Sequence, residues 1–264
     1  MKYARSRRYS SQEGGIPVPE MIINGLAIKF RNGETVLQAA RAGGIEIPAL
    51  CYHPGLGHHG SCRLCLVETL AGGRPGLAAS CALPASEKLV VQTDTERVAL
   101  ARRMTLGLML ARCPDAKPLQ ELAVKYGLIE FSPRPDTSGC ILCGRCVRAC
   151  SAVGKHVLGF SGRGRNRRAG VPFDRPPSTC MGCRACEQVC PVNIIKVVED
   201  RGRVTILPWQ AGIALDYCPK CGAATGPRDQ ADSLKKFSPT GPLGGLCPAC
   251  RRRFMASFAA PNSC

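Results

Sequence analysis

Two short runs of strand-forming residues flank Asn24-Gly25 in the segment EMIINGLAIKFRNG, at residues 20–33. Asn-Gly strongly favours the two-residue turn of a β-hairpin, so the segment predicts a hairpin. Residues 35–42 then show a short helical pattern, and the two glycines that follow it are typical of a helix end.

Two further strand-like runs complete this first part of the pattern. They are LVETL at residues 66–70 and LVVQT at residues 89–93. A hairpin, a helix and further strands around a glycine-rich loop predict an α+β module that ends near Thr93.

The next stretch, residues 94–127, has helical periodicity. Thr93 and Glu96 have the spacing of a capping box and precede the long run RVALARRMTLGLMLA, so a helix of about four turns is predicted. A second helical pattern begins at Pro118 and ends at Gly127. After a central stretch without long periodic runs, RVTIL at residues 203–207 predicts one more strand.

Composition favours several small modules over one large core. The chain has 264 residues, more than an average domain, with only 5% aromatic residues but 29 glycines and 21 prolines. Something other than hydrophobic packing must therefore hold the loops together.

Eighteen cysteines can serve that purpose, either as disulfides in a secreted protein or as metal thiolates in a reducing compartment. Residues 1–17 are polar and basic, and no apolar run follows Arg7-Arg8, which argues against a twin-arginine export signal. No other stretch approaches the ~20 apolar residues of a membrane span. We therefore expect a soluble, cytoplasmic protein with a flexible basic N-terminus, whose thiolates are available for metal.

The formal charge of +17 would ordinarily indicate nucleic acid or an anionic membrane as a partner. That count treats every cysteine as neutral, whereas ligating thiolates are deprotonated and give each all-cysteine site a net charge of about −2. Three clusters and one zinc would bring the loaded chain to about +9, so much of the basic excess compensates charge inside the protein.

The first cysteine group lies in the glycine-rich loop and just beyond it. Its members are separated by ten, two and fifteen residues, and a short pair with longer arms resembles the [2Fe–2S] loops of plant-type ferredoxins, although the first arm is longer. We predict one [2Fe–2S] cluster held by Cys51, Cys62, Cys65 and Cys81.

Three histidines, His53, His58 and His59, lie in the same loop. Two imidazoles serve one iron in Rieske centres, but four cysteines already complete the ligand set here. We therefore interpret these histidines as exposed or as neighbours of the ligands.

A repeated motif is the most specific signal in the chain. CILCGRCVRAC and CMGCRACEQVCP both have the spacing C-x₂-C-x₂-C-x₃-C, in which the fourth cysteine of each run ligates the other run's cluster. Zinc ribbons do not use this spacing twice. We predict two [4Fe–4S] clusters, one held by Cys140, Cys143, Cys146 and Cys190 and the other by Cys180, Cys183, Cys186 and Cys150.

Between the two motifs, residues 162–168 form the basic loop GRGRNRR. Phosphate or nucleic acid is one interpretation. Because no aromatic residues interleave with the arginines of this run, shielding of the anionic clusters or contact with an acidic partner is the better one.

The C-terminal tail contains two C-x₂-C pairs separated by 25 residues, an arrangement that makes a tetrahedral thiolate site. Zinc is the favoured metal, with mononuclear iron or a further iron–sulfur cluster as alternatives. The predicted ligands are Cys218, Cys221, Cys247 and Cys250, whereas Cys113 and Cys264 are expected to bind no metal.

The segments GETVLQAARAGGIEIPALCYHPGL, GSCRLCLVE and CILCGRCVRAC resemble the N-terminal region shared by the large iron–sulfur subunit of respiratory complex I, iron-only hydrogenases and NAD-linked formate dehydrogenases. The resemblance spans about residues 19–198. It implies a β-grasp fold for the first domain and a ferredoxin-like fold for the second.

Two departures from these relatives affect the interpretation. The family places a histidine and three cysteines between the modules for an extra [4Fe–4S] cluster, but this chain keeps only Cys113 there, so that cluster is predicted to be absent. The chain also ends soon after Cys250, which leaves no room for a molybdopterin or hydrogen-activating domain. It is therefore expected to be an accessory subunit, similar to the small diaphorase subunit of NAD-linked hydrogenases.

The predicted fold is α+β with five parts. They are a flexible basic N-terminus (1–17), a β-grasp [2Fe–2S] ferredoxin domain (18–93), a helical connector (94–135), a two-cluster bacterial-ferredoxin-like domain (136–207) and a zinc-ribbon-like tail (208–264).

The function expected from this organisation is electron transfer between a flavin- and NAD(P)-binding partner and a second catalytic subunit, of the hydrogenase or formate dehydrogenase type or in a bifurcating complex. The chain shows no nucleotide motif such as G-x-G-x-x-G opening a helix, and no residue is nominated as catalytic. A free-standing ferredoxin and an iron–sulfur nucleic-acid-binding protein are the alternatives.

Overall fold

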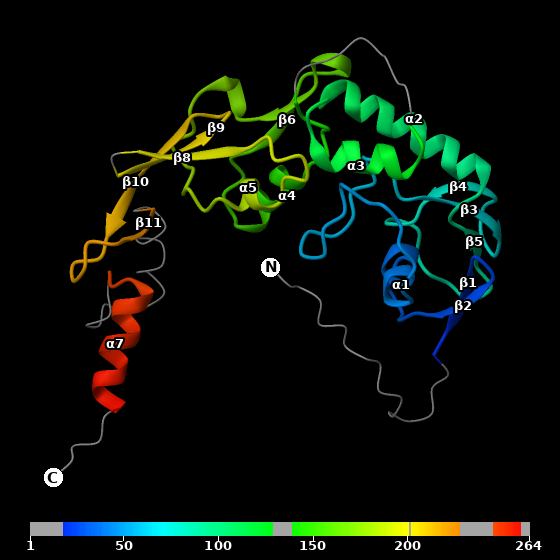
Figure 1. The fold of residues 1–264 in the computed structure, drawn as a ribbon, viewed down its shortest axis with the longest axis horizontal. Coiled ribbons are helices and arrows are strands. Elements are labelled where there is room, and N and C mark those ends of the chain that lie inside the picture. The colour runs from blue at the N-terminus through cyan, green and yellow to red at the C-terminus, as the bar shows by residue number, and fades with distance from the viewer. Residues whose placement is uncertain (1–17, 129–138, 201, 228–244, 260–264) are drawn as a thin grey trace.

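The computed structural model describes residues 18–128, 139–200, 202–227 and 245–259 (Figure 1). The predicted N-terminal segment 1–17, the end of the connector and Cys264 lie outside the described residues.

The first domain is a five-stranded sheet with one helix, in the order β2-β1-β5-β3-β4. Strands β1 and β5 run parallel, and the other neighbours pair antiparallel. The elements are β1 (Glu20–Ile23), β2 (Leu26–Lys29), α1 (Val36–Ala42), β3 (Leu66–Ala71), β4 (Gly76–Ala79) and β5 (Val90–Gln92). The arrangement is compatible with the predicted β-grasp domain, and it adds β4, which the sequence pattern did not predict.

Local sequence explains the start of this domain. Asn24 and Gly25 form the predicted turn with φ of 52° and 79°, and Ile23 pairs with Leu26 across it. Helix α1 begins with a capping box between Thr35 and Gln38, and its apolar face is fully buried in the domain core.

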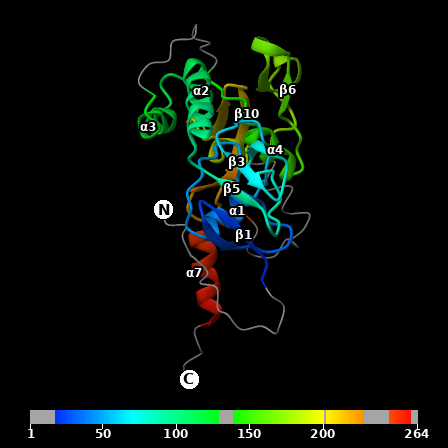
Figure 2. The same cartoon turned by 90° about the vertical axis from the view of Figure 1, so that its right-hand side faces the viewer.

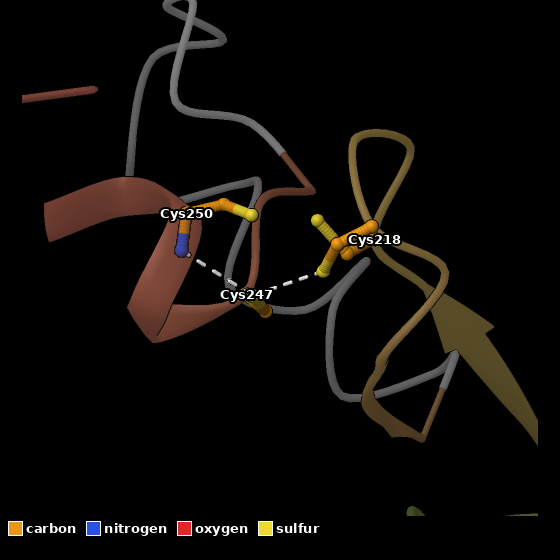
Figure 3. A group of neighbouring side chains, drawn as sticks. Cys218, Cys247 and Cys250 are labelled. Atoms are coloured by element: carbon orange, nitrogen blue, oxygen red, sulfur yellow. Dashed lines mark hydrogen bonds between the residues drawn. The ribbon is translucent and has the colours of Figure 1, made fainter. Parts of the chain in front are cut away.

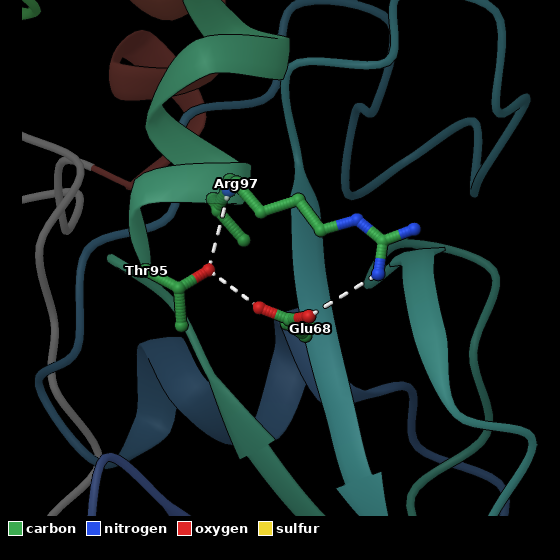
Figure 4. Close-up of polar contacts among 4 residues, drawn as sticks. Glu68, Thr95 and Arg97 are labelled. Atoms are coloured by element: carbon green, nitrogen blue, oxygen red, sulfur yellow. Dashed lines mark hydrogen bonds and ion pairs between the residues drawn. The ribbon is translucent and has the colours of Figure 1, made fainter.

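The connector consists of α2 (Glu96–Arg112) and α3 (Lys117–Lys125), which pack against each other; α2 also packs on β3. The predicted cap at Thr93 is wrong, because Thr93 is still tied to the sheet. Its backbone N–H donates to Asn24 Oδ1 at 2.8 Å, and Asn24 Nδ2 donates to Thr93 Oγ1 at 2.7 Å. Thr95 is the cap instead: its hydroxyl accepts from the Val98 N–H and donates to Glu68, which also pairs with Arg97 (Figure 4).

The two cysteine repeats surround the helices α4 (Arg145–Ala152) and α5 (Ala185–Gln188), with a small hairpin of β6 (Gly159–Ser161) and β7 (Arg168–Gly170) between them. Two 3₁₀ turns, η1 (Gly164–Asn166) and η2 (Pro172–Asp174), flank β7. Helices α4 and α5 contact each other, which brings the two repeats together.

A second sheet has the order β11-β10-β9-β8, and its buried side chains share one hydrophobic core with residues of the two repeats. Its strands are β8 (Lys196–Asp200), β9 (Arg203–Leu207), β10 (Ala211–Tyr217) and β11 (Ala224–Pro227), and β9 has the predicted bounds. Because β10 pairs with β9 along four residues, the boundary predicted between residues 207 and 208 falls inside this sheet.

The last element is α7 (Pro248–Ala259), which lies at the opposite end of the molecule from α2 in both views (Figures 1 and 2). No helix within the described ranges combines the length and the apolar character that crossing a membrane requires.

Candidate metal centres

The first-domain site, Cys51, Cys62, Cys65 and Cys81, is assembled from a long loop before β3 and the segment after β4. All four side chains are at most 1% exposed. The Cys51 thiol interacts with those of Cys62 and Cys81, and the Cys65 thiol interacts with that of Cys81. The contacts therefore link all four thiols, from Cys62 through Cys51 and Cys81 to Cys65, which brings four ligand sulfurs to one place as a single cluster requires.

The four thiols of this site differ in the direction in which their pKa values are shifted. Hydrogen bonds from Cys62 and Cys81 lower the pKa of Cys51, and a hydrogen bond from Cys81 lowers the pKa of Cys65 to about 6. The same contacts raise the pKa of Cys62 and Cys81. Two of the four ligand positions thus favour the thiolate that iron needs.

The loop histidines have partners outside this site. His53 Nδ1 accepts from the Gly55 N–H at 3.2 Å, and the His59 ring stacks on Phe160 with centroids 6.4 Å apart. His58 is exposed. These contacts are consistent with the interpretation that the histidines are not ligands, which stays a prediction.

The proximal cavity has a volume of about 240 Å³ and is lined by Cys140, Cys143, Cys146 and Cys190. Arg112, Arg168 and Trp209 contribute to its wall, and the Leu142 N–H donates to the Cys140 sulfur at 3.4 Å. Burial raises the pKa of Cys143 to about 11 and that of Cys146 to about 12.

The distal cavity is lined by Cys150, Cys180, Cys183 and Cys186, and Trp209 contributes to the walls of both cavities. The Val157 N–H donates to the Cys150 sulfur at 3.2 Å, and burial raises the pKa of Cys186 to about 12. Each cavity takes three cysteines from one repeat and the fourth from the other, which is the grouping that cross-ligation predicts. Ligation of iron by these sulfurs stays a prediction.

The two motif loops have the same backbone form. Left-handed φ values occur at Leu142 (55°) and Gly144 (70°) in the first loop, and at Gly182 (66°) and Arg184 (59°) at the matching places in the second. Glycine occupies only one of the two positions in each loop, so Leu142 and Arg184 adopt a conformation that costs a non-glycine residue about 1 kcal/mol. Both loops keep the left-handed turns at matching positions although the residues there differ. This is what we expect of two loops that hold cofactors of the same kind.

The tail site joins the turn between β10 and β11 to the start of α7 (Figure 3). Its four sulfurs, from Cys218, Cys221, Cys247 and Cys250, all lie within 4.8 Å of one another, and those of Cys221 and Cys247 are 3.6 Å apart. Tetrahedral zinc, with Zn–S bonds of about 2.3 Å, places sulfurs about 3.8 Å apart. The spacing therefore suits a single ion, and the Cys250 N–H donates to the Cys247 sulfur at 3.4 Å as in a metal knuckle.

Two side chains near these centres were missed by the sequence interpretation. Arg145 and Arg148 stand three residues apart on α4 and donate hydrogen bonds to the loop that carries Cys51. Their i, i+3 spacing within a cysteine motif predicts a shared helix face, but nothing in the sequence indicates what that face contacts.

Comparison with known proteins matches two families to the chain. The 2Fe-2S iron-sulfur cluster binding domain matches residues 20–96, and the 4Fe-4S dicluster domain matches residues 139–194. Among solved structures, a chain of NAD+-reducing [NiFe]-hydrogenase in the H2-reduced state is 38% identical with a TM-score of 0.53, over 58% of this chain and 75% of that chain.

The chain belongs to the same family of iron–sulfur subunits as this hydrogenase chain. Among curated relatives, the mitochondrial NADH-ubiquinone oxidoreductase 78 kDa subunit of Candida albicans is 32% identical over 78% of this chain and 32% of its own length. NADP-reducing hydrogenase subunit HndD of Solidesulfovibrio fructosivorans is 34% identical over 66% of this chain and 35% of its own length. The predicted resemblance to complex I and hydrogenase subunits is confirmed, and the chain spans about a quarter to a third of the curated relatives it matches.

Proposed function

We propose that this chain is an electron-relay subunit that carries one [2Fe–2S] cluster at the first-domain site and one [4Fe–4S] cluster in each cavity. The observation that carries the proposal is a single packed core that includes Cys51 and Cys62 of the first-domain site together with Cys143 of the proximal cavity. Ligands of two cofactors in one rigid core keep those cofactors close, which electron transfer between them needs.

The chain's own residues hold and shield the cofactors in this proposal. Cysteine thiolates supply the ligands, and backbone N–H groups such as those of Leu142 and Val157 donate to ligand sulfurs. Such hydrogen bonds raise reduction potentials by stabilising negative charge on sulfur. The clusters supply the one-electron chemistry when they are bound.

The partners in this proposal are a flavin- and NAD(P)-binding subunit and a second catalytic subunit, in the cytoplasm. The outer face of α2 supports a partner: Leu100, Met104 and Leu108 stand at i, i+4 and i+8 and are 55%, 56% and 58% exposed. An apolar row on a helix whose inner face is already packed is typical of a surface that another subunit covers.

The tail site is proposed to hold one zinc ion, with a structural role. The basic loop gives less support to nucleic-acid binding, because Arg168 pairs with Asp174 and Arg167 lies over the Phe160 ring at 4.7 Å. Two of its arginines are thus engaged within the loop region itself.

The test uses the chain and its native complex, purified anaerobically. The chain alone is expected to accept electrons from dithionite and to show no NAD(P) reduction with an artificial donor, whereas the complex catalyses that reduction. NAD(P) reduction by the chain alone contradicts the relay assignment. Purification without any stoichiometric partner favours the free-standing ferredoxin.

The apolar row on α2 has its own test in co-purification. Met104→Glu and Leu108→Glu are expected to reduce recovery of the partner subunits while iron content stays unchanged. Val124→Glu is the matched control, because Val124 is 82% exposed but lies on α3, outside the row. Equal recovery with all three variants contradicts this docking surface, and self-association of the chain through the row is the other outcome that rejects it.

A further inference from the structure

Helix α4 carries ligand positions of both cavities, Cys146 and Cys150, and it also contacts the loop of the first-domain site. The Arg148 guanidinium donates to the backbone carbonyls of Leu56 and Gly57 at 2.9 and 3.0 Å, and to that of Cys51. Arg145 donates to the carbonyl of Tyr52. Two side chains of one helix therefore hold the backbone of residues 51–57, including a ligand residue of the first-domain site.

Both arginines retain a donor that the described residues leave unused. The Nε atoms of Arg145 and Arg148 are buried, and neither has a hydrogen-bond partner within the described part of the chain. An unsatisfied buried N–H of a charged group is costly, so native structures rarely keep one without a partner such as water, an ion or a ligand.

The charge of Arg145 lies among thiols of two different sites. Burial lowers the pKa of Arg145, while the neighbouring thiols of Cys143 and Cys51 act in the opposite direction, with a smaller contribution from Cys62. None of the ion pairs found among the described residues includes Arg145 or Arg148. A half-buried guanidinium without a carboxylate needs another anion nearby, and a cluster with four thiolates, at about −2, is one.

The internal repeat shows that these arginines are not required for holding a [4Fe–4S] cluster as such. In the second motif, Ala185 and Gln188 occupy the places of Arg145 and Arg148. The arginines occur only in the repeat whose helix contacts the first-domain loop. Their role is therefore related to that loop.

Other contacts make this junction a defined one. The His59 ring stacks on Phe160, and a Cβ added at Gly144 would lie 2.9 Å from His59 Nε2, so the loop sits directly on the start of α4. On the other side, Arg112 of α2 donates to the Cys140 carbonyl at 2.8 Å.

We propose that Arg145 and Arg148 are positioning residues at the junction of the first-domain site and the proximal cavity: Arg148 fixes the loop of residues 51–57 on α4, and Arg145 places one positive charge and one free N–H donor between the two clusters. This inference rests on the proposed function. A fixed cation beside a cluster favours its reduced, more negative form, so Arg145 raises the reduction potential of both clusters. The distal cluster lies outside its contacts.

The experiment measures the midpoint potential of each cluster by EPR-monitored redox titration of the full chain, loaded anaerobically. Arg145→Gln is expected to lower the potentials of the [2Fe–2S] and proximal [4Fe–4S] clusters and to leave the distal cluster unchanged. Arg145→Lys keeps the charge without the planar fork, so it should restore most of the shift. Arg184→Gln is the matched control, because Arg184 lies in the second motif beside the distal cavity.

Arg148→Gln is expected to change the [2Fe–2S] EPR line shape and to speed loss of that cluster, because Arg148 holds the Cys51 carbonyl. A merely structural role for Arg145 would lower cluster occupancy without shifting potentials. The proposal is overturned if the potentials of the [2Fe–2S] and proximal clusters are unchanged in loaded Arg145→Gln. It is also overturned if Arg184→Gln shifts the potentials of these same two clusters equally.

A measurement on the unaltered chain decides the matter even if Arg145→Gln does not load. Reduction of the proximal [4Fe–4S] cluster should speed electron-spin relaxation of the [2Fe–2S] cluster, because the junction holds them close. Absence of this effect overturns the proposal. Absence of the clusters themselves would instead reject the proposed function, so the two failures are distinguishable.

Discussion

The proximal cavity and the tail site each use four cysteines, and both include C-x₂-C pairs, yet they differ in how far apart the sulfurs are held. In the tail, all four sulfurs lie within 4.8 Å of one another. In the proximal cavity, the four cysteines line a hollow of about 240 Å³. Ligand type is the same in both, so the backbone around the ligands decides the size of the cofactor.

The backbone difference is visible in each site. In the tail, the first pair lies in a tight turn, in which the Cys218 N–H donates to the Ala223 carbonyl at 2.8 Å and the Gly222 N–H donates to the Cys218 carbonyl at 2.9 Å. The second pair meets it with the Cys221 and Cys247 sulfurs 3.6 Å apart. The proximal loop instead takes left-handed turns at Leu142 and Gly144, which spread its three cysteines around the cavity, and Cys190 arrives from the other repeat. A compact knot suits one ion, and a lined hollow suits a four-iron cluster.

The largest expected effect comes from removing one ligand of each site. Cys143→Ala should lower the iron content by about four atoms per chain, whereas Cys247→Ala should remove one metal ion and leave the iron unchanged. Metal analysis of the purified variants measures both. Cys113→Ala is the control: it lies in the same buried core, and it should keep all the iron. Loss of about four irons from the tail variant would erase the distinction between the sites.

Metal removal gives the second contrast. A zinc chelator should release the tail ion and make α7 accessible to protease, because the tail site is what joins α7 to the β10–β11 turn. The EPR signals of the clusters should stay the same. Loss of the cluster signals along with the tail ion would show that the two regions do not act independently.

Loading of the sites should also differ in its response to pH. The raised pKa values of Cys143, about 11, and Cys146, about 12, mean that both thiols must release protons to bind iron. In the tail, a hydrogen bond from the Cys247 backbone lowers the pKa of Cys218 to about 6, and one from the Cys250 backbone lowers the pKa of Cys247. The hydrogen bond with Cys221 raises the pKa of Cys250 to about 12.

Reconstitution between about pH 6.5 and 8.5 should therefore favour iron uptake at the cavities more strongly with rising pH than it favours zinc uptake at the tail, since the thiolate fraction grows about tenfold per pH unit below the pKa. Parallel dependences for the two metals would contradict this reading of the thiols.

The smallest expected effect concerns the left-handed turn itself. Leu142→Gly removes the strain of a φ of 55°, whereas Leu142→Ala removes the same side chain and keeps the strain. The glycine variant should be more stable than the alanine variant by about 1 kcal/mol, seen as a higher midpoint of anaerobic thermal unfolding. A more stable alanine variant would mean that the turn at this position is not strained.

Local signals predicted much of the fold, and long-range contacts account for what was missed. The turn at Asn24-Gly25, the short helix predicted at residues 35–42 and the strand β9 follow from neighbouring residues. Strand β4 was missed because GLAA has no alternation of apolar and polar residues. The helix cap predicted at Thr93 was wrong because Asn24, 69 residues away, holds Thr93 in the sheet.

The candidate sites were predictable to a similar extent. Cysteine spacing indicates the cross-grouping of Cys150 and Cys190, since the motif itself requires it. The roles of Arg145 and Arg148 were not predictable, because their acceptors are backbone carbonyls more than 90 residues earlier in the chain, and a carbonyl leaves no mark in the sequence. The size of the tail site likewise depends on how two distant pairs meet.

The most direct test of the three-cluster relay is quantification of iron, acid-labile sulfide and zinc in one anaerobic preparation of the full chain, with Mössbauer spectra to assign the iron. We predict about ten irons, about ten sulfides and one zinc, with spectra of one [2Fe–2S] and two [4Fe–4S] clusters. About fourteen irons, or four irons in the tail, would contradict it, because a hollow site and a compact site would then hold the same cofactor.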